Sequence, residues 1–239
     1  ASMNKFMQIE KIVFGKNNSA LCALANDIEE LEQTLTQMGL VDRPAIVLIG
    51  GHILPEHGNV TLQAVEVIAK TAEVLDAAVI SGGTDVGVMA AIGKARGRGG
   101  YQFPLIGISR EGTVTWPEGP RTGATLLPNH EREQLEAHHS HFILVPGNQF
   151  GDESKWIVRA ASMITKDRNK SVTLLVNGGK VSQQDVEESL SAGRPLVVLE
   201  GTGRLADEIA SMPIKSKLIK SIPAHNRRLL AETLRAILA

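Results

Sequence analysis

Short, continuous apolar runs recur along the chain, and most of them end near glycine before a helical pattern begins. These runs do not alternate apolar with polar residues, which is typical of parallel strands buried on both faces between layers of helices. We therefore predict an α/β fold with a doubly wound, mostly parallel, Rossmann-like sheet of about six to seven strands and helices on both faces. The predicted strands are residues 45–49, 78–81, 104–108, 142–145, 172–176 and 195–199, with residues 12–15 as an added edge strand.

Between the apolar runs, hydrophobic residues recur at three- and four-residue spacing and predict helices. No linker or low-complexity tract interrupts this order, so we expect a single domain over residues 3–239. Ser182 with Asp185 resembles a capping box that opens one helix, and Gly193 is expected to close it. The helical stripes are Leu21, Leu24, Ile28, Leu31, Leu35 and Met38; Leu62, Val65, Ile68, Ala72 and Leu75; and Leu229, Leu230, Leu234 and Ile237.

Composition narrows the class of function. The net charge of -1 gives no strong field toward nucleic acid or an anionic membrane, and 3% aromatic residues argue against a base-stacking surface. No apolar run reaches the roughly 18 residues of a membrane helix, and no leader pattern is visible. The single cysteine, Cys22, lies in an apolar helical pattern and is expected to be a buried, inert thiol. We expect a cytoplasmic chain that binds no nucleic acid and contains no membrane segment.

Glycine turns follow four of the predicted strands, at Gly50-Gly51, Gly82-Gly83, Gly178-Gly179 and Gly201-Thr202-Gly203. The carboxyl ends of parallel strands share one edge of the sheet, where α/β folds bind ligands. Glycine lets the backbone approach a ligand closely, and the N–H groups of the following helix attract an anion. A single such turn can equally be structural, so the repetition along one edge is what predicts a crevice for a phosphate-bearing ligand.

Side chains at these turns supply polar groups. Thr84 can cap the next helix or donate to phosphate, and Gly87 would let that helix pack tightly. Arg204 can bind phosphate in a bidentate manner, and Asp207 can accept from ribose hydroxyls. Alternatively, Arg204 and Asp207 pair with each other across one helical turn.

Three other groups of residues leave alternatives open. The carboxylates of Asp152 and Glu153 follow a strand, where they can serve as acid and base, bind ribose or complement a helix dipole. His139 and His141 can share a strand face, but no cysteine or acidic ligand lies at zinc spacing around them, so no metal site is predicted. The irregular residues 110–137 can form a lid, an oligomer contact or an exposed excursion.

Four segments occur in an order that resembles a known superfamily. They are SGGTDVGVM at 81–89, LEAHHSHFILV at 135–145, VTLLVNGG at 172–179 and PLVVLEGTGRLAD at 195–207. Together they resemble the SLOG superfamily of Rossmann-like domains, named for Smf/DprA and LOG proteins. The nearest branch is the prokaryotic one related to the N-terminal region of TRPM channels. The resemblance spans roughly residues 44–212, which leaves an N-terminal strand and helix and a C-terminal helix as extensions.

The resemblance implies a sensor that binds a nucleotide-derived ligand such as ADP-ribose, requires no cofactor and self-associates as a homo-oligomer. Because the chain shows no membrane segment, any signal is expected to pass to an effector protein that remains unknown. Phosphate would be held by Gly82, Gly83, Thr84, Gly201, Thr202, Gly203 and Arg204, and ribose or base by Glu153, Asp207 and His141. Gly50, Gly51, Gly87, His139, Gly178, Gly179 and Glu200 complete the expected ligand-binding set.

Two alternatives remain beside the sensor. The phosphoribohydrolase branch of the superfamily carries PGGxGTxxE with a catalytic glutamate, and residues 177–185 here read NGGKVSQQD. An N-glycosidic hydrolase would then use Asp185, or Glu153, as its acid and base. The other alternative is a non-catalytic scaffold whose helices form a homo-oligomer.

Overall fold

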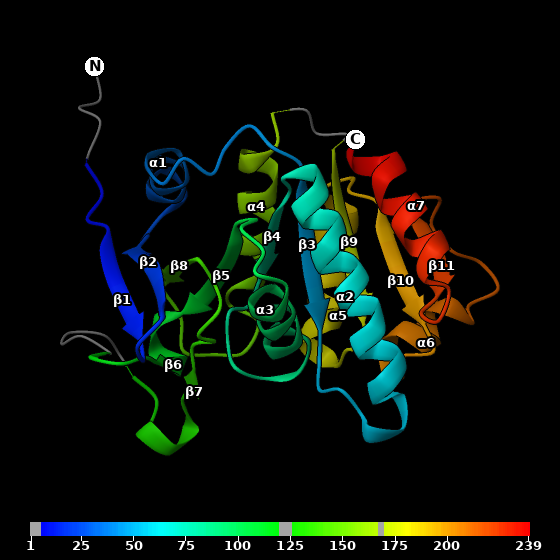
Figure 1. The fold of residues 1–239 in the computed structure, drawn as a ribbon, viewed down its shortest axis with the longest axis horizontal. Coiled ribbons are helices and arrows are strands. Elements are labelled where there is room, and N and C mark those ends of the chain that lie inside the picture. Colours follow the sequence, from blue (N-terminus) through cyan, green and yellow to red (C-terminus); the bar gives the residue numbers. More distant parts are fainter. Residues whose placement is uncertain (1–5, 120–125, 167–169) are drawn as a thin grey trace.

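The computed structural model describes residues 6–119, 126–166 and 170–239. Within these ranges the main sheet has nine strands in the order β1-β2-β8-β5-β4-β3-β9-β10-β11, all parallel except the antiparallel pair β1–β2 (Figure 1). A separate two-stranded ribbon joins β6 (Val114–Thr115) to β7 (Glu133–Gln134). The main strands are β1 (Glu10–Phe14), β2 (Asn18–Leu24), β3 (Ala45–Gly50), β4 (Ala78–Ser81), β5 (Leu105–Arg110), β8 (His141–Val145), β9 (Ser171–Val176), β10 (Leu196–Glu200) and β11 (Ile219–Pro223).

The predicted fold class is confirmed, but the expected six to seven strands are corrected to nine. Residues 21–24, predicted as the start of a helix, belong to β2, which lies between β1 and β8. Ala20 and Cys22 turn inward there, while Leu21 and Leu24 are exposed, so their spacing imitated a helical stripe. The other additional strand, β11, pairs only with β10 at the far edge of the sheet. Polar residues interrupt its apolar pattern, which hid it in the sequence.

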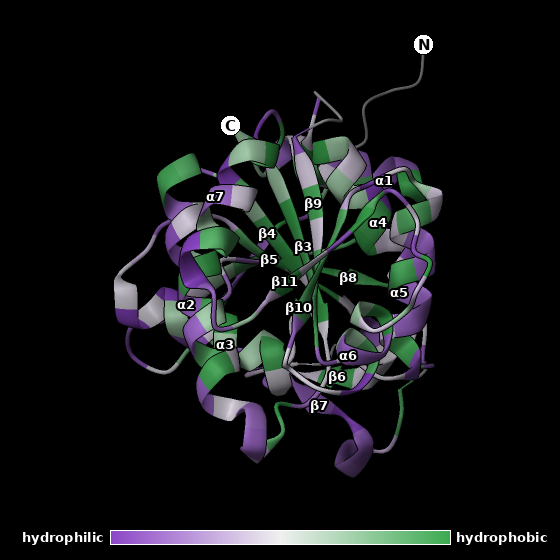
Figure 2. Cartoon of the chain, turned by 90° about the vertical axis from the view of Figure 1, so that its right-hand side faces the viewer, coloured by the Kyte–Doolittle hydropathy of each residue, from purple (hydrophilic) through white to green (hydrophobic). Residues whose placement is uncertain are grey.

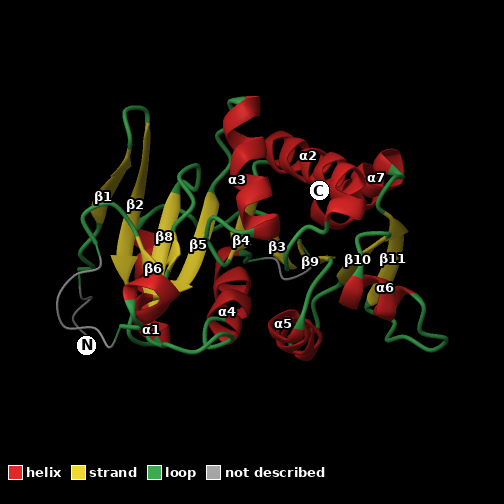
Figure 3. Cartoon of the chain, turned by 90° about the horizontal axis from the view of Figure 1, so that it is seen from below, coloured by secondary structure: helices red, strands yellow, loops and turns green. Residues whose placement is uncertain are grey.

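Helices cover both faces of the sheet, as Figure 3 shows from below. Helices α2, α3 and α7 pack on one face around one cluster of buried residues, and α1, α4, α5 and α6 pack on the other around a second cluster. Figure 2 shows the strands as the most hydrophobic part, with polar residues on the outer sides of the helices. The helices are α1 (Ile28–Gln37), α2 (Gly58–Leu75), α3 (Gly87–Gly99), α4 (Ser154–Ile164), α5 (Lys180–Ser191), α6 (Arg204–Ala210) and α7 (Arg227–Leu238).

The order of the strands creates a switch point between β3 and β9. From β3 the chain adds β4, β5 and β8 in one direction, then returns to place β9 on the opposite side of β3 and continues outward to β10 and β11. The connections therefore diverge at the carboxyl ends of β3 and β9. Open α/β sheets bind ligands in the crevice at such a point.

Helix ends agree only in part with the sequence. Gly193 follows the end of α5 with a φ of 72°, as predicted. The capping box is wrong, because α5 begins at Lys180 with Gly179 as its N-cap, which places Ser182 and Asp185 inside the helix. Helix α1 has a side-chain cap instead, since Asp27 accepts a 2.8 Å hydrogen bond from the Glu30 N–H.

The described part of residues 110–137 covers the sheet near β2 and β8. Val114 and Leu135 are buried and pack with Phe142 in a third apolar cluster. Val114 and Leu135 therefore cover the core, whereas Leu126 and residues 128–131 are exposed. Residues 120–125 lie outside the described residues. No helix in the described ranges combines the length and the apolar character needed to cross a bilayer.

Candidate functional site

A cavity of about 270 Å³ lies at the carboxyl edge of the sheet, at the switch point between β3 and β9. The turns after β3, β4 and β9 line it, together with the end of β5, the loop after β8 and the first residues of α5 and α6. Residues from distant parts of the sequence therefore meet around one space, as the glycine turns predicted. Eight of the predicted residues line it: Gly50, Gly51, Gly82, Thr84, Glu153, Gly179, Asp185 and Arg204.

Two glycines bring the backbones around the cavity close together. A methyl group on Gly50 would lie 2.2 Å from the carbonyl oxygen of Val176, on the neighbouring strand β9. A methyl group on Gly87 would lie 2.2 Å from the carbonyl oxygen of Gly51. Glycine at 87 therefore lets the start of α3 pack closely on the turn after β3, as we predicted from the sequence. Gly87 does not line the cavity.

The guanidinium of Arg204 lies over two of the glycine turns. A methyl group on Gly179 would come within 2.5 Å of Arg204 Nη2, and one on Gly51 within 3.5 Å of Nη1. Arg204 also has a φ of 49°, a left-handed conformation that is rare for residues other than glycine and is often found at functional sites. Among the described residues no carboxylate pairs with Arg204, so its charge is free to bind an anion.

A second arginine reaches the cavity from the end of β5. Arg110 is 4% exposed, and its Nε lies 3.1 Å from Glu153 Oε2. Its Nη1 is buried without a hydrogen-bond partner among the described residues. The ring of Phe150 covers this guanidinium at 4.3 Å from the ring centre. Burial raises the pKa of Glu153, and the charge of Arg110 offsets part of that rise.

Asp185 lies inside α5 and lines the same cavity. Burial first, and then the nearby carboxylates of Glu153 and Glu188, raise the pKa of its carboxyl from 3.8 to about 7. Near neutral pH this group therefore holds a proton for much of the time, so it opposes a bound anion less than an ordinary aspartate would.

Several cavity residues were not predicted as site residues. Arg110 directly follows a predicted strand, so its place at the carboxyl edge could have been found from the sequence. Phe150 and Lys180 had no comparable signal, because a lone aromatic in a loop and a lysine after glycine occur widely. The cavity residues that were missed are Leu48, Ile49, His52, Val86, Met89, Ser109, Arg110, Glu133, Phe150, Ile157, Lys180, Val181 and Ser182.

The turn after β10 lies outside the cavity lining. The Asp207 carboxylate accepts hydrogen bonds from the N–H groups of Gly201 at 2.7 Å and Gly203 at 3.1 Å. The Thr202 hydroxyl accepts from the Asn177 N–H at 2.9 Å. The Asp207 carboxylate, the N–H groups of Gly201 and Gly203, and the Thr202 hydroxyl are therefore already engaged within the protein. They fix the loop from which Arg204 extends.

Four more predicted residues lie away from the cavity. Gly83 and Gly178 belong to the turns after β4 and β9 but do not line the cavity, and Glu200 is exposed at the end of β10. His141 begins β8, at the opposite edge of the sheet from the cavity, and Ser140 Oγ lies 2.7 Å from its Nδ1. Burial and then the positive charges of Arg96 and Arg43 lower the pKa of His141 to about 4.

His139 is buried beneath the turn after β4. Its Nε2 lies 2.8 Å from Ser81 Oγ, and its Nδ1 lies 2.8 Å from Glu136 Oε2. Its ring also stacks on Phe142. His139 therefore supports the turn from behind instead of facing the cavity. Within the described ranges, no three histidine, cysteine or acidic side chains converge as a metal ion would require.

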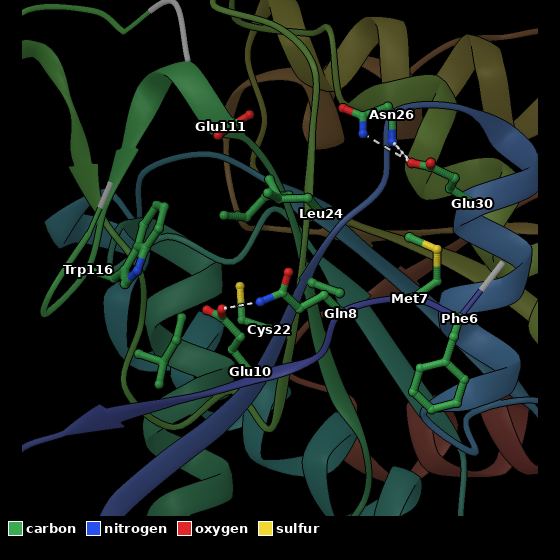
Figure 4. A pocket seen from close by; sticks show the side chains of 13 residues that line it. Phe6, Met7, Gln8, Glu10, Cys22, Leu24, Asn26, Glu30, Glu111 and Trp116 are labelled. Carbon is green, nitrogen blue, oxygen red and sulfur yellow. Dashed lines mark hydrogen bonds between the residues drawn. The ribbon is translucent and has the colours of Figure 1, made fainter. Parts of the chain in front are cut away.

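A second cavity, of about 350 Å³, lies beside β1 and β2 (Figure 4). Its walls include Cys22 and Trp116, and the charged side chains that line it in the described structure are Glu10, Glu30 and Glu111. Carboxylates repel phosphate, and of these two cavities only the one at the carboxyl edge has arginine or lysine in its described lining, Arg110, Lys180 and Arg204, so it is the better phosphate site.

Comparison with known proteins gives a family and two kinds of relative. The family described as "SLOG in TRPM, prokaryote" matches residues 43–236. The transient receptor potential cation channel subfamily M member 2 of Rattus norvegicus is 26% identical over 231 residues, which cover 80% of this chain. Its counterpart in Mus musculus is 28% identical over 190 residues, which cover 65% of this chain. The chain spans only 15% of the rat protein and 12% of the mouse protein.

Solved structures share the fold at low sequence identity. The X-ray structure of TM1055, a structural genomics target, aligns with a TM-score of 0.55 at 17% identity, over 81% of this chain and 99% of that one. The molybdenum cofactor binding protein of Rippkaea orientalis aligns with a TM-score of 0.54 at 14% identity, over 82% of this chain and 98% of that one. The resemblance inferred from the four sequence motifs is thus confirmed, and the family match continues to residue 236.

Proposed function

Because this chain belongs to the family described as SLOG in TRPM, prokaryote, we propose that its crevice binds a nucleotide-derived, phosphate-bearing ligand such as ADP-ribose. In this proposal the domain is a ligand sensor. The proposal includes that the domain forms a homo-oligomer, lies in the cytoplasm and passes its signal to an effector protein. The family match and the placement of the cavity at the switch point support a ligand-binding domain in general.

The observation that carries the proposal is the position of Arg204. Its guanidinium lies over Gly51 and Gly179, at the junction of the two halves of the sheet, and no carboxylate in the described structure neutralises it. A planar guanidinium suits bidentate contact with phosphate oxygens. The left-handed backbone of Arg204 indicates that this placement is maintained at a cost in local stability.

Other cavity residues suit the remaining parts of a nucleotide. The buried, unpartnered Nη1 of Arg110 and the ammonium of Lys180 can meet further phosphate oxygens. Phe150 is 58% exposed and offers a ring for stacking against a base. The carboxylate of Glu153 can accept hydrogen bonds from ribose hydroxyls.

Thermal unfolding with a panel of ligands tests the proposal. The panel contains ADP-ribose, NAD, AMP, ADP, ATP, cyclic nucleotides and ribose 5-phosphate. A ligand present at a hundred times its Kd adds about 2.7 kcal/mol, which raises the melting temperature of a domain of this size by about 5–10 °C. We expect such a shift with at least one nucleotide and its loss in Arg204→Ala. The absence of a shift with every phosphate-bearing compound would contradict the proposal.

A second candidate function rests on Asp185. A carboxyl group with a pKa of about 7 in the same cavity can act as a general acid near neutral pH. The chain would then hydrolyse an N-glycosidic bond by protonating the leaving base. Chromatography of each nucleotide after incubation tests this function. Free base that accumulates with the wild type and not with Asp185→Asn would support the hydrolase. A ligand that stays intact with both proteins would favour the sensor function.

A further inference from the structure

A closed circuit of hydrogen bonds lies beneath the Gly82-Gly83 turn. The Gly83 N–H donates to Ser81 Oγ at 3.0 Å, and Ser81 Oγ lies 2.8 Å from His139 Nε2. His139 Nδ1 lies 2.8 Å from Glu136 Oε2, and the Glu136 N–H donates to the Gly83 carbonyl oxygen at 2.9 Å. The Gly83 carbonyl oxygen is therefore linked directly to the Glu136 N–H, and the Gly83 N–H is linked to the Glu136 carboxylate through Ser81 and His139.

The chemistry of the groups assigns the protons in this circuit. Burial by itself would raise the pKa of Glu136, but the hydrogen bond and electrostatic attraction of His139, together with hydrogen bonds from His138, outweigh it, so the pKa lies below its ordinary value. The ionised carboxylate only accepts, which places a proton on Nδ1 of His139. In the tautomer protonated only on Nδ1, Nε2 accepts the Ser81 hydroxyl proton, and the Ser81 oxygen accepts from the Gly83 N–H. Each donor in the circuit has an acceptor.

Helix α3 closes over the same carboxylate. A methyl group on Gly93 would lie 1.9 Å from Glu136 Oε2, and one on Gly97 would lie 2.5 Å from His138 Cδ2. Both glycines belong to the helix that follows the turn. The circuit therefore holds both the turn and the surface on which α3 packs. Its three side chains, Ser81, Glu136 and His139, are each 1% exposed or less.

We propose that Ser81, His139 and Glu136 are positioning residues that hold the Gly82-Gly83 turn in the shape that receives the ligand's phosphate. The part that concerns phosphate rests on the proposed function. The φ of Gly83 is 78°, and a methyl group there would lie 2.8 Å from Gly107 Cα, so the turn is tightly constrained. Ser81 is fully buried and its oxygen is engaged on both sides, so it acts through the turn and not as a nucleophile.

The circuit is tested first without ligand, by hydrogen exchange and by ¹⁵N NMR of the histidine rings. We expect the His139 signals of a neutral ring with the proton on Nδ1. We expect exchange at the Gly83 amide to accelerate at least ten-fold in Ser81→Ala and in Glu136→Gln, and to remain slow in Ser81→Thr, which keeps the hydroxyl. Ser189→Ala is the matched control, because it removes a buried hydroxyl that bonds to Thr173 on another element. Unchanged exchange at Gly83 in Ser81→Ala would overturn the circuit.

The consequence for binding is tested by calorimetric titration with ADP-ribose. We expect Ser81→Ala to weaken binding roughly ten-fold, as the loss of an ordering hydrogen bond allows. Ser189→Ala is expected to lower the melting temperature similarly and to bind like the wild type. Equal affinities of Ser81→Ala and the wild type would refute the positioning role. If the wild type itself bound no compound of the panel, the proposed function would be wrong. Hydrogen exchange at the Gly83 amide would still show whether the hydrogen-bond circuit holds the turn.

Discussion

The guanidinium of Arg204 rests against the bare α-carbon of Gly179, where an added methyl group would lie 2.5 Å from Nη2. The two residues come from different strand-to-helix turns, after β9 and β10. Glycine at 179 thus makes room for the charge that we assign to phosphate binding, in addition to serving as the N-cap of α5.

The Gly179→Ala variant should fold and bind the nucleotide more weakly. The clash falls on the end of a flexible side chain, so the cost in stability is about 1 kcal/mol, mainly from the poorer N-cap. Displacement of the guanidinium should lower affinity about ten-fold, measured by calorimetry. Gly193→Ala is the control, because it strains a residue with a φ of 72° that has open space around it. It should lose similar stability and keep its affinity, and equal affinities in all three proteins would argue against the assignment.

Arg204→Gly should separate stability from binding. Glycine accepts the φ of 49° without strain, so the free energy of unfolding should rise by up to about 1 kcal/mol. Loss of the charged contact should weaken nucleotide binding roughly 10- to 100-fold. Chemical denaturation and calorimetry measure the two effects. Arg228→Ala, at an exposed arginine on α7, should leave affinity unchanged. Retained affinity in Arg204→Gly would remove this residue from the site.

Asp185→Asn should stabilise the protein at high pH. The folded pKa of about 7 lies above the value of 3.8 for an exposed aspartate, so the folded state binds more protons between these values. Wild-type stability therefore falls as pH rises from about 4 to 7, by as much as roughly 4 kcal/mol. The advantage of the variant should be absent below pH 4 and reach a plateau above pH 7 in denaturation curves. A constant difference across this range would show that the Asp185 carboxyl is not perturbed.

Cys22 should be unreactive in the folded protein. The residue is 8% exposed, and burial, aided by the Glu111 charge, raises the pKa of its thiol to about 12. Because the thiolate is the reactive form, labelling by a thiol reagent at pH 8 should be slow until the β1–β2 edge of the sheet opens. Labelling followed by mass spectrometry should show rates that rise steeply with denaturant. Rapid labelling of the native protein would contradict this burial.

The sequence predicted most of the fold because parallel strands between two helical layers are apolar on both faces. Ala45–Gly50 carries that pattern in full, and Ser171–Val176 carries it with Thr173 as its one internal polar residue; both formed the strands expected of them. Asn18–Leu24 lies next to the antiparallel edge strand, where one face is partly exposed, and its apolar spacing matched a helix equally well. Pairing with β1 and β8 favoured the strand over the helix, and that pairing depends on the whole sheet.

The site divides in the same way. Glycine after a buried strand predicted that the turns at Gly50, Gly82 and Gly179 share one edge, and this follows from parallel strand direction alone. The sequence could not show that the Asp207 carboxylate would close its own turn.

By itself, then, the sequence determined the strand-and-helix order, the edge at which the glycine turns gather and the family, because these depend on local pattern and chain direction. The tertiary structure decided which polar groups are free and which are engaged with one another. Arg204 is left open over Gly179, whereas Asp207 is saturated by backbone N–H groups and His139 is enclosed between Ser81 and Glu136. Such differences arise from hydrogen bonds and burial among residues distant in the sequence, which no local pattern encodes.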